Sequence, residues 1–411
     1  ISNFEGIGNA LGKIAAETYI VDSTRRLAAA AIDLGERPSV ISAIAKVHAT
    51  EKTREVINLG MDIVGGKGIC HGPSNFLAEA HIQTPISITV EGANLLTRCL
   101  IIFGQGAIRC HPNLLKLIEC AQNPNDDESS REFDSLIKKH AYSLTKNVYK
   151  SFISSFFGGG TLTSTSFIDP SCSKFLKAAD QYSAAYSVVA DYCLFSLGGK
   201  LKRKELISAR LGDILSNLFM ISACLKRHED LERPNWNLPI LIVACKICLN
   251  NIQLAFSGLF QNLPNRFSTF LVKKIIFPFG FKNYTPTDND LLKAGEIISK
   301  IGVARDLYSS EVFFPQDLSD SELKNEPIAC IEKALKSSQE VEKIEAKIRS
   351  AEKRGRFIDN PGANVRDIAN EAFKEKIITK EEFESINIRN KLRDLVINVD
   401  EFDSNLGKVI E

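Results

Sequence analysis

The stretch MDIVGGKGICHGPSNFLAEAHIQTPISITVEGANLLTR, residues 61–98, decides how the fold of this chain is interpreted. It contains two features that bear on chemistry. The first is the glycine-rich run GGKG at 65–68, because a backbone without side chains can approach a ligand closely. The second is Glu91, a single carboxylate within an apolar run. Apolar surroundings raise the pKa of a carboxyl group, so Glu91 is a candidate general base.

Outward from this stretch the sequence predicts helices. Residues 4–34 and 39–64 carry apolar side chains at helical spacing. Glycines at 35 and 65 end these two helices. Residues 73–80 predict a short helix, 83–89 around Pro85 an extended lead-in, and the segment from about Glu91 a further helix. More helices are expected at 131–156, 172–197, 201–228, 237–262 and 266–277, and a charged helical section after about residue 320. We therefore predict an all-α fold.

Composition narrows the class of protein. The chain has 411 residues, of which 44% are hydrophobic and 25% charged, as in ordinary globular proteins. The formal net charge is +1, which argues against a nucleic-acid partner. The ten cysteines are scattered, and with no signal peptide at the start we expect reduced thiols in the cytoplasm. Cys245 and Cys248 form the closest pair, but nothing at zinc-ligand spacing accompanies them, so we expect a core helix and no metal site.

The acidic stretch NPNDDESS at 123–130 is the clearest predicted linker. It divides the chain into a helical domain at 1–122 and a second helical domain at 131–411. No uninterrupted apolar run reaches the roughly 20 residues that span a bilayer. The segment 271–281 is apolar with two lysines, a pattern that fits either a buried connector, which we favour, or a contact with a membrane surface.

Plain structural explanations exist for both features of the opening stretch. The run at 65–68 lacks the spacing of a P-loop and does not follow a strand, so it equally fits a turn at the end of a helix. Glu91 equally fits a first-turn glutamate favoured by the helix dipole.

Considered together, these motifs resemble the C-terminal helical domain of the acyl-CoA dehydrogenases. Their residue sequence is most similar to that of the large bacterial FadE-type enzymes. In that family a helix ends in a Gly-Gly-x-Gly loop, and a Tyr-Glu-Gly-Thr motif follows. Here the corresponding segments are the loop at 65–68 and Val90-Glu91-Gly92-Ala93. The resemblance also covers GPSNFLAEA at 72–80, IFGQGAIRCHP at 102–112, GGKLKRKELISARLGDILSNL at 198–218, QNLPNRF at 261–267 and, more weakly, INVDEFD at 397–403. It implies an incomplete dehydrogenase helical bundle followed by the FadE-type extension.

The resemblance implies a flavoprotein reaction. Glu91 would remove the α-proton of a fatty acyl-CoA thioester, and a hydride would pass from the β-carbon to FAD, giving trans-2-enoyl-CoA in fatty-acid β-oxidation. The implied flavin contacts are Gly65, Gly66, Asp62 and Ala93, of which Asp62 stands where the family has glutamine and Ala93 where it has threonine. The implied substrate contacts are Val90 and Gly92.

The same resemblance implies partners. Electron-transfer flavoprotein or a similar acceptor would reoxidise the enzyme, and the full-length protein would be a homo-oligomer in the cytoplasm or at the inner membrane surface. The family places an N-terminal helical domain and a β-domain ahead of this region, so we expect a C-terminal portion that is inactive alone. A non-catalytic helical scaffold derived from such an enzyme stays open as the alternative.

Overall fold

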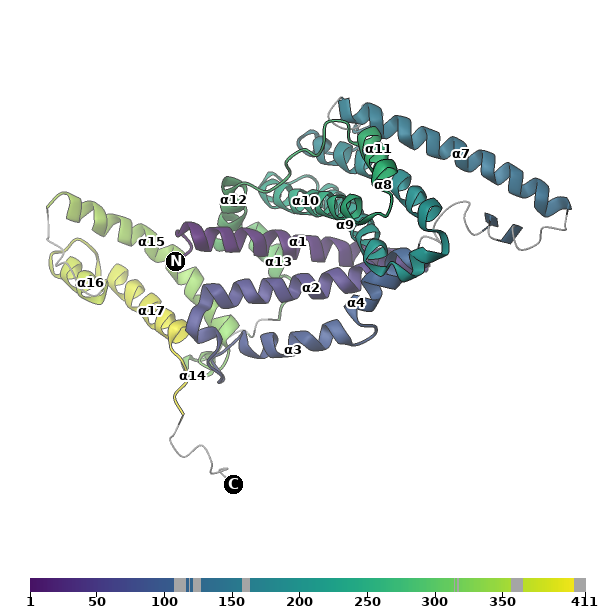
Figure 1. Cartoon of the computed structure of the whole chain (residues 1–411). Coiled ribbons are helices and arrows are strands. Elements are labelled where there is room, and N and C mark those ends of the chain that lie inside the picture. The colour runs from purple at the N-terminus through teal and green to yellow at the C-terminus, as the bar shows by residue number, and fades with distance from the viewer. Residues whose placement is uncertain are drawn as a thin grey trace, which may run out of the picture. The chain divides into compact units, whose positions relative to one another are not determined.

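A computed structural model describes residues 1–106, 116–117, 119–120, 127–156, 163–313, 315, 318–355 and 365–402 of the chain. Every regular element among these residues is a helix (Figure 1). The predicted all-α class is therefore confirmed. The chain forms two compact units, and neither is continuous in sequence. The larger comprises Asn3–Val56 and Thr84–Gly295, and the smaller Ile1–Ser2, Ile57–Gln83 and the chain from Glu296 onward.

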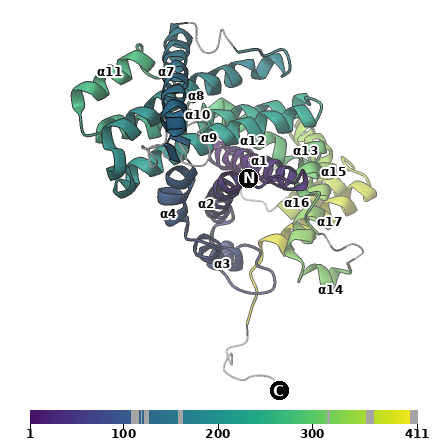
Figure 2. The ribbon, with the colours of Figure 1, turned by 90° about the vertical axis from the view of Figure 1, so that its right-hand side faces the viewer.

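Nearly all long helices belong to the larger unit. In chain order its helical elements are α1 (Glu5–Asp33), α2 (Ser39–Val64, ending in the smaller unit), α3 (Ala78–Thr89, beginning there), α4 (Asn94–Leu96), η2 (Thr97–Gln105, a π-helix), α7 (Asp127–Phe156), η3 (Pro170–Cys172), α8 (Ser173–Leu197), η4 (Gly198–Arg203), α9 (Glu205–Asp230), η5 (Asn235–Asn237), α10 (Leu238–Asn262), α11 (Arg266–Ile276) and α12 (Asp288–Ser299). Figures 1 and 2 show α9 and α10 side by side and against α1.

The core of the larger unit centres on α10. This helix is apolar on most of its circumference, so it is covered on most sides. Cys245 and Cys248 are both fully buried in it, as the sequence predicted. Arg98 on η2 forms a bidentate ion pair with Asp213 on α9, at 2.7 and 2.5 Å, which fixes the π-helix against this core.

Glycines let α1 and α12 pack closely. A Cβ atom at Gly12 would lie 2.1 Å from the carbonyl oxygen of Leu291, and one at Gly295 would lie 2.3 Å from that of Gly8. Neither position can accept a larger residue without moving the backbone. The sequence therefore keeps residues of poor helix propensity at these two crossings.

The smaller unit joins the end of α2 to the C-terminal helices. Its further elements are η1 (Gly65–Gly68), α13 (Val303–Ser309), α14 (Asp320–Leu323), α15 (Pro327–Lys353), α16 (Val365–Lys374) and α17 (Lys380–Ile397). Helices α15 and α17 lie side by side, and a core that includes Val341, Ile348 and Ile386 fills the space between α15, α16 and α17. Complete capping boxes begin α14 and α17.

Most predicted helices lie within a few residues of those observed, but three predictions were wrong. Residues 83–89 are not an extended lead-in, because α3 continues through Pro85 to Thr89. Proline disfavours a helical residue before it, which led to the extended prediction. The short helix begins at Ala78 rather than near 73, and the next helix begins at Asn94 rather than near Glu91 or Gly92.

The predicted linker is only partly described by the structure. Residues 123–126 fall outside the described residues, and 127–130 form the first turn of α7. The expectation that no segment could span a membrane also needs revision, because α9 and α10 are long and apolar enough by length and composition. In this fold both helices are packed into the core of the larger unit.

Candidate functional site

Glu91 lies in the turn between α3 and α4. Helix α3 ends at Thr89, and the amide of Val90 closes its last turn on the carbonyl of Ile86 at 3.1 Å. Glu91 then adopts a left-handed conformation with φ 54°, and Gly92 follows with φ 102°. A side chain is unfavourable in the left-handed region, so the backbone here carries strain of about 1 kcal/mol. Such strain is often retained where a side chain has a function.

Three residues of α2 hold this turn in place. Lys46 on α2 donates to the carbonyl of Gly92 at 2.7 Å and to Oδ1 of Asn94 at 2.5 Å. The Asn94 amide in turn donates to Thr50 at 2.8 Å and to Glu51 at 3.0 Å. The turn is therefore fixed by polar contacts to α2, whereas Glu91 makes none of them.

The Glu91 carboxylate is free to act. Within the part of the chain that the structure describes, it has no hydrogen-bond or ion-pair partner, and no side chain caps α4. Helix α4 begins at Asn94 and has no acidic residue in its first turn, so Glu91 is not the first-turn glutamate that the alternative explanation requires.

The apolar pocket expected around Glu91 is not closed in this chain. Glu91 is exposed, and the apolar side chains beside it in sequence are also exposed: Ile86 is 60%, Val90 50%, Leu95 71% and Leu96 48% accessible. Single exposed apolar residues are common, and these four lie within five positions of Glu91 in sequence. Their exposed side chains are available for contact with a ligand or with another part of a protein.

The glycine loop forms η1 directly after α2. Gly65 has φ 65°, which ends α2, and both Gly65 and Gly66 are exposed. A Cβ atom at either position would have nothing within 4 Å. Packing inside this chain therefore does not require glycine at 66, and at 65 only the backbone conformation requires it.

The far side of the loop is tied down. The side-chain amide of Asn75 donates to the carbonyls of Lys67 at 2.8 Å and Cys70 at 2.6 Å. Asp62 is exposed in the last turn of α2, where a negative charge is disfavoured by the helix dipole. The loop thus presents two bare glycines and an acidic side chain to solvent on a fixed frame.

The predicted site residues fall into two groups. Val90, Glu91, Gly92 and Ala93 share the turn in the larger unit. Asp62, Gly65 and Gly66 share one helix end in the smaller unit. Each group is brought together locally, and their functional assignments stay predictions.

A cluster of metal-ligand residue types lies elsewhere, at Asp169, Cys172 and His228. His228 is fully buried, with Nε2 3.3 Å from Asp169 and Nδ1 3.4 Å from the side-chain amide of Asn237. Because the Asn237 amide is a donor, Nδ1 accepts its hydrogen bond, and Nε2 carries the ring proton that it donates to Asp169. Burial raises the pKa of the Cys172 thiol to about 12, so the thiol stays protonated. We interpret this cluster as a buried hydrogen-bond network that stabilises the core.

Comparison with known proteins agrees with this architecture. The family profile described as "Acyl-CoA dehydrogenase, C-terminal, bacterial type" matches residues 108–402, and that described as "Acyl-CoA dehydrogenase, C-terminal domain" matches residues 1–102. The fold and the two profiles define a helical C-terminal dehydrogenase region. The chain belongs to the acyl-CoA dehydrogenase family.

A solved structure shares the fold. An acyl-CoA dehydrogenase complexed with FAD from Bacillus anthracis is 17% identical to this chain, with a TM-score of 0.52. The match covers 76% of this chain and 50% of that protein, so the chain spans about half the length of this relative.

Sequence reasoning missed the residues that support the candidate site. Lys46 and Lys67 look like ordinary surface lysines, because each is flanked by a helical or loop pattern that explains it. The partner of Lys67 lies more than 300 residues away in sequence. No local spacing could have revealed that contact.

Proposed function

We propose that this chain is the C-terminal half of an FAD-dependent dehydrogenase that converts fatty acyl-CoA to trans-2-enoyl-CoA in β-oxidation. The observation that carries the proposal is the Glu91 turn. An exposed glutamate with a left-handed backbone lies among exposed apolar residues in sequence, in a chain of the acyl-CoA dehydrogenase family. The two profile matches to C-terminal regions and the half-length match to a complete relative support the assignment as a C-terminal half.

In this proposal Glu91 is the general base. Its carboxylate takes the α-proton of the thioester, and the turn held by Lys46 and Asn94 keeps it in one place while it does so. A bound acyl chain would cover the exposed side chains of Val90 and Leu95. Covering them removes water from around the carboxylate, which makes it a stronger base. Val90 and Gly92 are the proposed substrate contacts.

The residue types at the glycine loop fit the approach of a flavin. Gly65 and Gly66 present exposed backbone with open space where side chains would stand, so a planar group can come close to them. Asp62 and Ala93 complete the proposed contacts. When bound, FAD would supply the acceptor for the hydride from the β-carbon. The proposed physiological acceptor is an electron-transfer flavoprotein, and the proposed assembly is a cytoplasmic homo-oligomer.

The test replaces the base in the full-length product of the gene. Glu91→Gln keeps the shape of the side chain and removes its basicity, so the rate of substrate-dependent dye reduction should fall by 10²–10⁴-fold. Exchange of the α-proton with deuterated solvent should fall in parallel. Glu79→Gln, an exposed glutamate on α3, is the matched control and should leave both rates unchanged.

The alternative is a non-catalytic helical scaffold. The exposed apolar surface beside Glu91 would then be a protein interface. If full-length protein carrying Glu91→Gln reduces dye and exchanges the α-proton at the wild-type rate, the base assignment is rejected and the scaffold is favoured.

We also propose that α11 contacts the surface of an anionic membrane. Phe267 is 74% accessible and Phe279 70%, and Leu271 and Ile275 are also exposed. The segment 271–281, expected to be a buried connector, is mixed: Ile276 and Phe277 are buried, whereas Leu271, Ile275 and Phe279 are exposed. No acidic residue occurs between 263 and 287, whereas four basic residues do. Basic, aromatic amphipathic helices bind anionic lipid surfaces.

Liposome co-sedimentation tests this contact. Wild-type protein should sediment with vesicles containing anionic lipid and stay in solution with neutral ones. The double variant Lys273→Glu/Lys274→Glu should stay in solution with both, while Lys200→Glu/Lys202→Glu, on the exposed face of η4, should behave as wild type. Equal sedimentation of all three proteins with anionic vesicles would contradict the proposal.

A further inference from the structure

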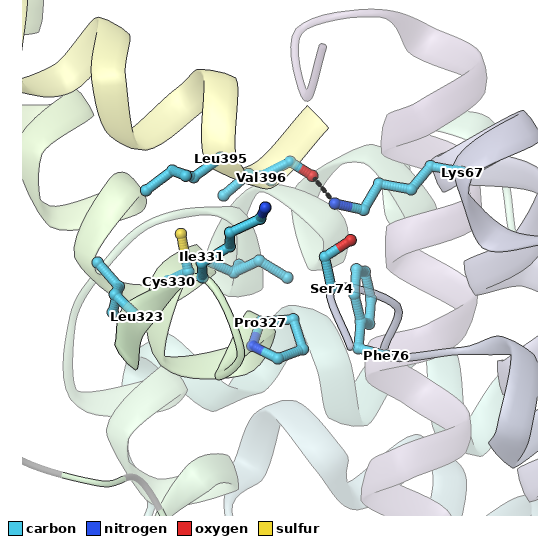
Figure 3. Close-up of a pocket in the computed structure, with 10 residues that line it drawn as sticks. Lys67, Ser74, Phe76, Leu323, Pro327, Cys330, Ile331, Leu395 and Val396 are labelled. Atoms are coloured by element: carbon cyan, nitrogen blue, oxygen red, sulfur yellow. Dashed lines mark hydrogen bonds between the residues drawn. The ribbon is translucent and has the colours of Figure 1, made fainter. Parts of the chain in front are cut away.

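The lysine of the glycine loop caps a helix that lies far away in sequence. Lys67 Nζ donates to the carbonyl of Val396 at 2.5 Å (Figure 3) and to that of Asn398 at 2.8 Å, at the end of α17. Helix α17 has no basic residue in its own last turn. A cation there satisfies unpaired carbonyls and opposes the negative end of the helix dipole. Lys67 therefore joins the loop to the last helix of the smaller unit.

A second contact lies a few residues further along both segments. Asp400 accepts hydrogen bonds through Oδ2 from the backbone amide of Ser74 at 2.9 Å and from its hydroxyl at 2.6 Å. The hydrogen bond from the Ser74 hydroxyl is the largest influence that lowers the pKa of Asp400, so the carboxylate is charged at neutral pH. Charge-assisted bonds of this kind are the stronger class.

Gly72 makes room for that carboxylate. A Cβ atom at this position would lie 2.3 Å from Oδ2 of Asp400, and the φ of 142° is itself unfavourable for a side chain. The loop sequence is therefore shaped to receive the tail. This explains the absence of a side chain at Gly72, which neither a helix end nor a flavin contact explains.

The loop side and the C-terminal helices also line one small cavity. Lys67, Ser74 and Phe76 contribute to it from the loop side, and Leu323, Pro327, Ile331 and Leu395 from the C-terminal helices. Figure 3 shows Phe76 beside Pro327 and Lys67 beside Val396. Gly65 and Gly66 remain exposed.

We infer that the segment Val396–Asp400 is a latch that positions the glycine loop for its ligand. Lys67 and Asp400 are positioning residues: they hold the loop from behind and do not touch the ligand. The identification of that ligand as a flavin rests on the proposed function, whereas the latch itself rests on the contacts above. The segment Val396–Asp400 thereby supports the structure of the glycine loop.

Hydrogen–deuterium exchange on the 411-residue chain tests the latch directly. Lys67→Met and Asp400→Ala should each speed exchange of the amides of residues 67–76 on the order of tenfold, because each removes charge-assisted bonds. Gly72→Ala should do the same without removing any charged group. Glu401→Gln and Lys300→Met are matched controls, since neither side chain bonds to the loop.

The double variant Lys67→Met/Asp400→Ala separates one latch from two unrelated contacts. If the contacts form one unit, the double variant should exchange little faster than either single variant. Unchanged exchange at 67–76 in both single variants, an equal rise in Glu401→Gln, or fully multiplicative effects in the double variant would overturn the latch.

A binding measurement on the full-length holoenzyme tests the positioning role. Released and re-added FAD should bind roughly tenfold more weakly to Asp400→Ala than to wild type or Glu401→Gln. Faster loop exchange with unchanged FAD affinity would overturn the positioning role. Failure of the wild type to bind FAD would instead overturn the proposed function, and the exchange experiment would still decide the latch.

Discussion

The glycine loop and the Glu91 turn share a left-handed backbone conformation, which is adopted by a glycine in the loop and by a glutamate in the turn. Gly65 has φ 65° directly after α2, and Glu91 has φ 54° just after α3, followed by Gly92 at φ 102°. A lysine donates to a backbone carbonyl in each case: Lys46 to that of Gly92, and Lys67, which belongs to the loop itself, to that of Val396.

The difference lies in what the conformation costs. Glycine adopts the left-handed region freely, so Gly65 needs no explanation beyond its turn. Glutamate does not, yet it is present at 91 and makes no contact that repays the strain. Glu232, Arg233 and Lys376 also have positive φ, so this conformation alone assigns no role. Under the proposed function, Gly65 is kept for its conformation and Glu91 for its carboxylate.

The largest expected effect on stability comes from a buried ion pair between α1 and α2. Lys52 on α2 pairs with Glu17 on α1, and both side chains are over 90% buried. Lys52→Met leaves a buried carboxylate without its partner and should lower the free energy of unfolding by about 3–5 kcal/mol. Chemical denaturation measures this loss, and hydrogen exchange should rise around the Glu91 turn but not at the latch.

Two controls belong to this experiment. Arg54→Met removes the exposed pair with Glu51 and should cost less than about 1 kcal/mol. Glu17→Leu/Lys52→Met removes both charges and should recover much of the stability. Equal losses in Lys52→Met and Arg54→Met would contradict the assignment of a buried pair.

The next effect is local to the Glu91 turn. Lys46→Met removes the donor to Gly92 and Asn94 and should cost about 2 kcal/mol, because bonds from a charged group are worth about 1.5–3 kcal/mol. Exchange at residues 90–97 should increase, while exchange at 65–76 should not. A uniform rise across both regions would mean that the two turns are not held independently.

Much of the fold could be predicted from the sequence because its helices are long and their ends are marked. Gly35, Pro38 and Gly65 bound the first two helices, which were placed within one residue of the observed bounds. The prediction was wrong at Pro85, where a local rule about proline is overridden by the continuing turns of α3. A sequence pattern records local preference, and packing settles the exceptions.

The site was predictable only in part. Glu91 and the two glycines stand out in sequence because each breaks a helical pattern. Their supports do not, since Lys67 meets Val396 only through the fold of the smaller unit. The exposure of Val90 and Leu95 was also unpredictable, because an apolar run looks the same whether it is packed or uncovered.

Lowering the pH should destabilise the region around His48 before it disrupts the latch. Burial and the nearby charges of Lys52 and Arg98 lower the pKa of His48, on α2, to about 3. Below pH 6.5, His48 takes up a proton in the unfolded chain but not in the folded chain. The free energy of unfolding therefore decreases as the pH is lowered. The slope from this residue is up to about 1.4 kcal/mol per pH unit.

The latch should survive this range. The lowered pKa of Asp400 keeps its carboxylate charged until the pH falls below the usual aspartate value of 3.8. Unfolding of wild type and His48→Gln at pH 7.5, 6.5, 5.5 and 4.5 measures the difference. The variant should lose less stability than wild type below pH 6.5, and parallel curves would contradict the assignment to His48.

The smallest effects test the comparison itself. Gly65→Ala puts a Cβ atom into open space but in the left-handed region, so it should destabilise the chain by about 1 kcal/mol through conformation alone. Glu91→Gly relieves the same strain and should stabilise the chain by up to about 1 kcal/mol. Differential scanning calorimetry of the two variants and of Gly66→Ala, where φ is not positive, gives the signs. If Glu91 is the base, as proposed, Glu91→Gly should also abolish dehydrogenation in the full-length enzyme, because it removes the carboxylate. If Glu91→Gly destabilises the chain instead, the Glu91 side chain contributes to packing after all, and its retention at a left-handed position no longer argues for catalysis.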